Sequence, residues 1–134
     1  MYLLIFFILF SCTPEDEKIF KRIEGVWLID KVTYKIQNIR EEFYVNTLIF
    51  EKINGSCFIK IPRTESHEAE NAFISITSKN DSSFIEIESI NKKIRGTYNM
   101  KFRTDDNNIL ILELSSNKCS FLLKKLPTVS ERIF

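Results

Sequence analysis

Short apolar runs, each bounded by Asn, Asp, Gly, Ser or Pro, follow one another through this chain of 134 residues from Gly25 onward. β-branched and aromatic side chains are frequent within the runs, and turn-forming residues gather between them. This pattern is typical of successive β-strands, so we expect an all-β fold. We expect about eight strands, over residues 26–36, 46–53, 56–61, 72–78, 83–89, 94–103, 109–114 and 118–126.

Alternation within these runs predicts that each strand buries one face. The clearest case is the run over residues 94–103, in which Tyr98 and Met100 alternate with polar side chains. A strand with this period points its apolar residues to a core and its polar residues to water. Gly96 in the same run is a candidate bend or bulge. Asn54-Gly55 predicts a tight hairpin, because both central residues of a type I′ turn need positive φ.

One short helix is expected before the first strand. Ile19, Phe20 and Ile23 lie at helical spacing on one face of residues 15–24. The connections between the later strands are short enough for neighbouring antiparallel pairing. Such strands can close into an up-and-down barrel or split into a sandwich.

A local motif favours the barrel. Gly25-Val26-Trp27 opens the first predicted strand directly after the predicted helix. This resembles the G-x-W start of lipocalin-like proteins. The resemblance implies a lipocalin-like up-and-down antiparallel barrel of about eight strands with a short N-terminal helix. It also implies that Gly25 and Trp27 form a structural plug, in which the indole closes one end of the barrel.

The chain departs from the lipocalin pattern at two places. Thr104-Asp105 lies between the sixth and seventh predicted strands, where the family has T-D-Y, but Asp106 replaces the tyrosine. The family packs a basic residue of the last strand on the tryptophan, and only Lys124 or Lys125 can supply it here. These departures indicate a divergent bacterial lipocalin-like domain.

The N-terminus reads as an export signal. Residues 2–10 are apolar and too short to cross a bilayer as a helix, for which about 20 residues are needed. The run Leu9-Phe10-Ser11-Cys12 resembles the lipobox of bacterial lipoproteins. The resemblance implies cleavage before Cys12, a diacylglyceryl group on its thiol and a further fatty acid such as palmitate. The usual basic region before the run is missing, and a buried N-terminal strand with an incidental cysteine is the alternative.

These patterns divide the chain into a signal peptide (1–11), a lipidated cysteine with an acidic tether (12–18) and a lipocalin-like barrel domain (19–134). Pro14 and the acids after it favour an extended, solvated tether. Such acids also resemble the tag that carries some lipoproteins to the outer surface of diderm bacteria. We therefore expect a protein of the bacterial cell envelope, anchored by lipid in the outer membrane and facing the periplasm or the cell surface.

Nucleic acid, metal and cofactor chemistry find little support. A balance of 19 basic and 18 acidic side chains offers no basic stripe for a phosphate backbone. His67 is the only histidine, and near Glu65, Glu68 and Glu70 no second His or Cys stands at ligand spacing. Neither G-x-S-x-G, nor a glycine-rich phosphate loop, nor Cys-x-x-Cys occurs. We expect no enzyme activity, no catalytic residue, no metal and no cofactor.

Cys57 and Cys119 remain once Cys12 is lipidated. An envelope compartment would permit a disulfide between them. However, they fall on the third and eighth predicted strands, which are not neighbours in a barrel, and a disulfide needs Cα atoms within about 7 Å. We therefore expect two buried free thiols.

Two functions remain open. In the first, the barrel binds a small hydrophobic ligand that enters at the end opposite Trp27. In the second, the same inward side chains fill the interior, and the surface loops make the protein an accessory subunit or inhibitor of an envelope enzyme. Family resemblance favours ligand binding, whereas the many large side chains favour a filled barrel. The inward candidates are Leu48, Phe50, Ile59, Ile74, Ile85, Ile87, Tyr98, Met100, Leu112 and Phe121.

Overall fold

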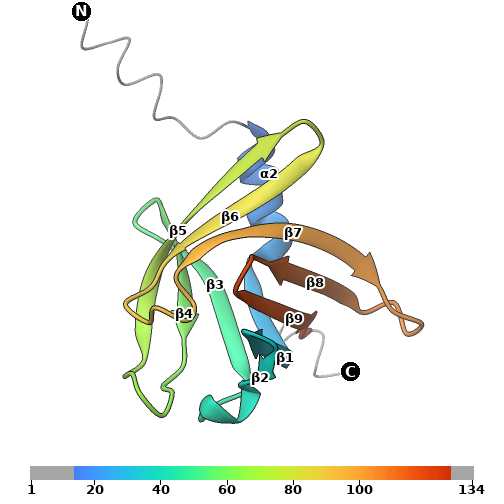
Figure 1. Cartoon of the computed structure of the whole chain (residues 1–134). Helices are drawn as coiled ribbons and strands as arrows, with labels where there is room; N and C mark the ends of the chain where they lie inside the picture. Colours follow the sequence, from blue (N-terminus) through green and yellow to red (C-terminus); the bar gives the residue numbers. More distant parts are fainter. Residues whose placement is uncertain (1–13, 128–134) are drawn as a thin grey trace, which may run out of the picture.

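Eight antiparallel strands close into a barrel in the computed structural model, which describes residues 14–127 (Figure 1). Neighbouring strands pair in chain order, and pairing of β1 with β9 closes the sheet. The expected all-β, lipocalin-like up-and-down barrel is confirmed. Its strands are β1 (Gly25–Tyr34), β3 (Thr47–Ile53), β4 (Ser56–Ile61), β5 (Glu70–Lys79), β6 (Ser82–Glu88), β7 (Gly96–Thr104), β8 (Leu110–Ser115) and β9 (Cys119–Lys125).

Helix α2 (Pro14–Ile23) precedes the barrel. Proline suits the first turn of a helix, where its missing N–H would have no partner. Acidic side chains occupy the first turn and basic ones the last, which matches the helix dipole. The helix expected over residues 15–24 is confirmed, and the extended tether expected over residues 12–18 is wrong from Pro14 onward, because the same proline and acids begin this helix. The predicted signal peptide and Cys12 lie outside the described residues.

The strand boundaries differ from the expected ones at two instructive places. β7 begins at Gly96, after a tight turn in which the N–H groups of Ile94 and Arg95 donate to the carbonyl oxygen of Asn91. Gly96 thus marks the bend that leads into the strand. The second place is an irregularity in β1 that no residue pattern predicts: the pairing with β9 shifts between Ile29 and Lys31.

Two-residue hairpins join several strands. Asn54 and Gly55 have φ of 51° and 83°, which confirms the turn expected between β3 and β4. Asn80 and Asp81 form the corresponding turn between β5 and β6, with φ of 50° and 64°. Asn, Asp and Gly tolerate these left-handed angles, so both turns match their residue types.

A third such turn does not match its residues. Lys35 and Ile36, with φ of 48° and 76°, join β1 to the short strand β2 (Gln37–Asn38). Left-handed backbone is strained for a β-branched residue. The Ile36 side chain is also 99% exposed, so no packing offsets this cost.

The two ends of the barrel are covered differently. α2 packs its apolar face against the end where β1 begins, which we call the helix end (Figure 1). The opposite end, which we call the mouth, is bordered by the β1–β2 hairpin, the short helix η1 (Arg40–Glu42) and the loops over residues 62–69, 89–95 and 116–118.

Candidate functional site

The inward side chains expected to line a ligand site all lie in one buried cluster. Their exposed fractions range from 0% for Phe50 to 7% for Ile74. A side chain that bordered a void wide enough for a water molecule would keep accessible surface there, yet Phe50, Ile85 and Leu112 keep none. The structure therefore brings the predicted residues together, and it packs them against one another as a core.

Tyr98, one of the predicted inward residues, places a polar group inside the barrel. Its ring meets that of Phe121 edge-on, with ring centres 5.8 Å apart. The hydroxyl donates a hydrogen bond to the carbonyl oxygen of Ile94, in the turn that precedes β7. Burial raises the pKa of Tyr98 far above its usual range. This hydroxyl thus fixes the turn at the mouth to the core, and the inward position of a tyrosine was the available signal.

We predict that Tyr98 makes stability fall with pH in alkali. The folded protein keeps this proton above pH 10.0, the ordinary pKa, where the unfolded chain releases it. The contribution is fully present below that pH and is lost as the pH rises above it. Denaturant titrations at several pH values above 10 give the free energy of unfolding as a function of pH. This free energy should fall less steeply in Tyr98→Phe than in the wild type, by about 1.4 kcal/mol per pH unit. Tyr44→Phe is the control, because Tyr44 is 60% exposed; an equal change in both variants would contradict the assignment.

Cys57 and Cys119 do not pair with each other, as expected, but Cys57 is only half-buried, whereas both were expected to be buried. Cys57 lies near the start of β4 at the helix end, whereas Cys119 begins β9 at the mouth. Cys119 is buried, and this burial raises the pKa of its thiol. A buried neutral thiol is a poor nucleophile, so Cys119 serves as a core residue.

Trp27 closes the helix end, in the structural role that the lipocalin resemblance implies. Its side chain is fully buried, and its Nε1 donates a hydrogen bond of 2.7 Å to the carbonyl oxygen of Ile23. Ile23 is the last residue of α2, where carbonyl groups lack partners within the helix. Gly25, with φ of 127°, lets the chain turn from the helix into β1. One indole therefore fills the end of the barrel and caps the helix.

Lys125 supplies the basic residue that packs on the tryptophan. It pairs with Trp27 across β1 and β9, and its Nζ lies 5.5 Å from the indole ring. The same Nζ donates a hydrogen bond of 2.8 Å to the carbonyl oxygen of Arg22. A cation is favourable at a helix C-terminus. Lys124, the other candidate, pairs with Leu28 and lies on the opposite face of β9.

We predict that Trp27→Ala lowers the free energy of unfolding by about 3 to 5 kcal/mol, the usual range for removing a buried tryptophan. The ring, the hydrogen bond to Ile23 and the surface under Lys125 are all lost. Trp27→Phe keeps a ring but loses the hydrogen bond, so it should fall between the wild type and Trp27→Ala. Urea unfolding followed by circular dichroism measures both. Little change in Trp27→Ala would show that the indole does not hold the helix to the barrel.

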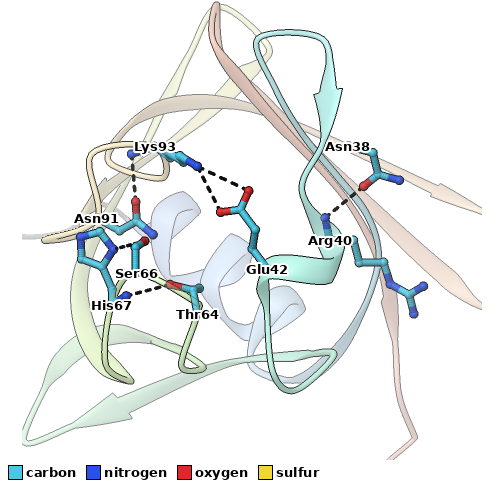
Figure 2. Close-up of polar contacts among 8 residues, drawn as sticks. All are labelled: Asn38, Arg40, Glu42, Thr64, Ser66, His67, Asn91 and Lys93. Carbon is cyan, nitrogen blue, oxygen red and sulfur yellow. Dashed lines mark hydrogen bonds and ion pairs between the residues drawn. The ribbon is translucent and has the colours of Figure 1, made fainter.

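An ion pair crosses the mouth. Lys93 Nζ lies 3.1 Å from Glu42 Oε1, and Figure 2 shows the two side chains pointing toward each other from opposite sides of the opening. Lys93 comes from the loop between β6 and β7, and Glu42 comes from η1. Asn91 holds the lysine loop by accepting a hydrogen bond from the Lys93 N–H through Oδ1. The mouth is thus closed by contacts between its loops as well as by the core below.

His67 lies in the β4–β5 loop beside the mouth (Figure 2). Its N–H donates to Oγ1 of the buried Thr64 at 3.1 Å, and its Nδ1 shares a hydrogen bond with Ser66. These contacts shape the loop. Within residues 14–127, no three metal-ligating side chains gather in one place. The same residues hold no helix with the length and apolar character needed to cross a bilayer.

An apolar groove lies at the helix end, where α2 meets the rim of the barrel. This groove has a volume of about 440 Å³ and runs between α2, the β3–β4 hairpin and β5. Ile74 is the one member of the predicted ligand set that lines it. Phe73, beside it on the outer face, is 52% exposed and stacks on Phe58 with ring centres 4.5 Å apart. Inward Ile74 and outward Phe73 both line the groove, so it lies at the rim of the barrel, under α2.

Comparison with known proteins adds no relative: no family model, curated protein or solved structure matches this chain. The lipocalin resemblance rests on the residues themselves.

Asp105 lies after β7, and its Oδ1 accepts hydrogen bonds from the N–H groups of Asn107 and Ile109. These bonds, the one from Ile109 first, lower the pKa of Asp105. Asp105 therefore shapes the β7–β8 turn without the tyrosine that follows it in lipocalins.

Proposed function

We propose that this chain is a non-catalytic interaction protein of the bacterial cell envelope, anchored by a lipid on Cys12, which binds a protein partner with its outer surface. The observation that carries the proposal is the filled interior. Trp27 and Phe50 are fully buried, and the predicted ligand side chains pack against one another. A small hydrophobic ligand would need space that these side chains occupy.

The distribution of exposed apolar side chains supports a role for the surface. Five large apolar side chains among residues 14–127 are more than half exposed. Four of them, Ile36, Tyr44, Val45 and Ile90, lie at the mouth, and the fifth, Phe73, lies on the outer face of β5. Exposed apolar side chains that gather at one end of a soluble domain mark candidate interaction sites.

Binding of a small hydrophobic ligand is the second candidate, favoured by the ion pair at the mouth. Lys93 and Glu42 are 39% and 25% exposed, and ion pairs so accessible to water contribute little stability. Breaking this pair and moving the β6–β7 loop would open the mouth. A ligand could then enter only if the core side chains rearranged.

We predict that the wild-type protein shows no saturable binding of a fluorescent fatty acid. The assay compares the wild type with two variants that each break one surface ion pair. Lys93→Gln opens the pair at the mouth, and Lys60→Gln breaks the 3.2 Å pair with Glu51 on the outer face. Because the interior is filled, neither variant should bind. Saturable binding that rises in Lys93→Gln but not in Lys60→Gln would contradict the proposal and support the ligand-binding alternative.

The anchor is tested separately. We predict that cells grown with labelled palmitate incorporate the label into the wild type but not into Cys12→Ser. Mass spectrometry should then find a mature wild-type chain that begins at Cys12 and carries fatty acids, whereas Cys12→Ser stays uncut. Cys57→Ser is the matched control and should be labelled like the wild type. A mature protein that retains Met1 and carries no fatty acid would remove the anchor from the proposal.

A further inference from the structure

Three turns meet on one side of the mouth. They cover residues 34–38, 90–95 and 116–118, and we call them together the basic turns. The Lys35 N–H donates to the carbonyl oxygen of Lys118 at 2.8 Å, which joins the first turn to the third. Lys118 Nζ donates to the carbonyl oxygen of Lys92 at 2.7 Å, which joins the third to the second. The basic turns therefore form one continuous surface.

The charged side chains of these turns are all basic, and two carboxylates border them: Glu42 pairs with Lys93, and Glu70 Oε2 accepts a hydrogen bond of 3.2 Å from the Ile90 N–H. The basic turns contain Lys35, Lys92, Lys93, Arg95 and Lys118, but no Asp or Glu, although the whole chain is nearly balanced at 19 basic and 18 acidic residues. The side chains of Lys35, Lys92 and Arg95 are exposed. Among the described residues none of these three has a carboxylate partner, and such exposed cations attract an anionic partner.

Apolar side chains stand among these cations. Ile36 is 99% exposed and Ile90 is 65% exposed. Ile36 also holds a left-handed φ of 76°, although the other two-residue hairpins place Asn, Asp or Gly at such angles. The fold gains nothing from isoleucine there, because its side chain touches almost nothing. A strained, exposed residue of this kind points to a contact outside the molecule.

We propose that the basic turns bind an acidic segment of a partner protein, with Ile36 and Ile90 as apolar contacts. This inference deepens the proposed function by naming the surface and the chemistry of the partner. The position of α2 favours a protein over a lipid bilayer. α2 begins at Pro14, two residues after the proposed lipid on Cys12, and it covers the helix end. The basic turns lie at the opposite end and so face away from the anchoring membrane.

The test uses the full-length chain and poly-L-glutamate as an acidic polypeptide probe, with binding measured by calorimetry at low and moderate salt. The triple variant Lys35→Ala, Lys92→Ala and Arg95→Ala should bind the probe roughly tenfold more weakly, or not at all. Binding by the wild type should weaken as salt is added, because the contacts are exposed to solvent.

A matched variant controls for net charge. Lys21→Ala, Lys79→Ala and Lys101→Ala remove the same charge from exposed positions outside the basic turns. This variant should bind poly-L-glutamate like the wild type. An equal loss of affinity in both triple variants would show that only the net charge matters and not the position of the cations, and it would overturn the proposal.

Ile36→Gly separates contact from folding. Glycine relieves the left-handed strain, so the melting temperature should rise. Affinity for an acidic copolymer of glutamate and tyrosine should nevertheless fall, because its tyrosine rings supply the apolar partner of Ile36 that poly-L-glutamate lacks. A rise in melting temperature with unchanged affinity would show that Ile36 takes no part in binding.

Two further outcomes would overturn the proposal. The first is no binding of poly-L-glutamate by the wild type. The second is a different dependence for two anionic probes: the triple variant of the basic turns loses binding to phosphatidylglycerol vesicles but keeps its binding to poly-L-glutamate. This result would make a bilayer the partner. Fatty acid binding inside the barrel would contradict the proposed function and would leave the comparison of the two triple variants unaffected.

Discussion

The hydrogen bond from Trp27 to the last carbonyl group of α2 is the contact on which this structure most depends. A short helix has little stability of its own and needs its apolar face packed and its end capped. Trp27 provides both, because its ring fills the helix end of the barrel while its N–H caps Ile23. Lys125 joins β9 to the same helix end by donating to Arg22. One cluster thus ties together the first strand, the last strand and the helix.

Most of the fold could be predicted from the sequence because its signals are local. Alternation along strands fixes which face is buried, and Asn54-Gly55 fixes a turn through backbone angles that few residues tolerate. The helix was also predicted, within one residue of its start at Pro14, from the spacing of its apolar residues. One feature escaped prediction because it depends on tertiary context: the shift in β1 between Ile29 and Lys31 arises from its pairing with β9.

The candidate site was predicted in part. The inward residues were identified correctly as one set, since period two places them on one face, but their packing density is a property of the closed barrel. The ion pair between Glu42 and Lys93 joins residues far apart in the chain, and no sequence pattern predicts it. The basic turns escaped notice for the same reason, because Lys35, Lys92 and Lys118 become neighbours only when the barrel closes.

The central claim is that the barrel interior is filled, so that the protein acts through its surface. Xenon offers a direct test, because it enters apolar cavities in protein interiors and is visible in crystals. We predict that crystals pressurised with xenon show no xenon among Phe50, Ile85 and Leu112, and that any bound xenon lies in the groove beside α2. A xenon atom at the centre of the barrel would contradict the account, because it would show a cavity there and favour ligand binding inside the barrel.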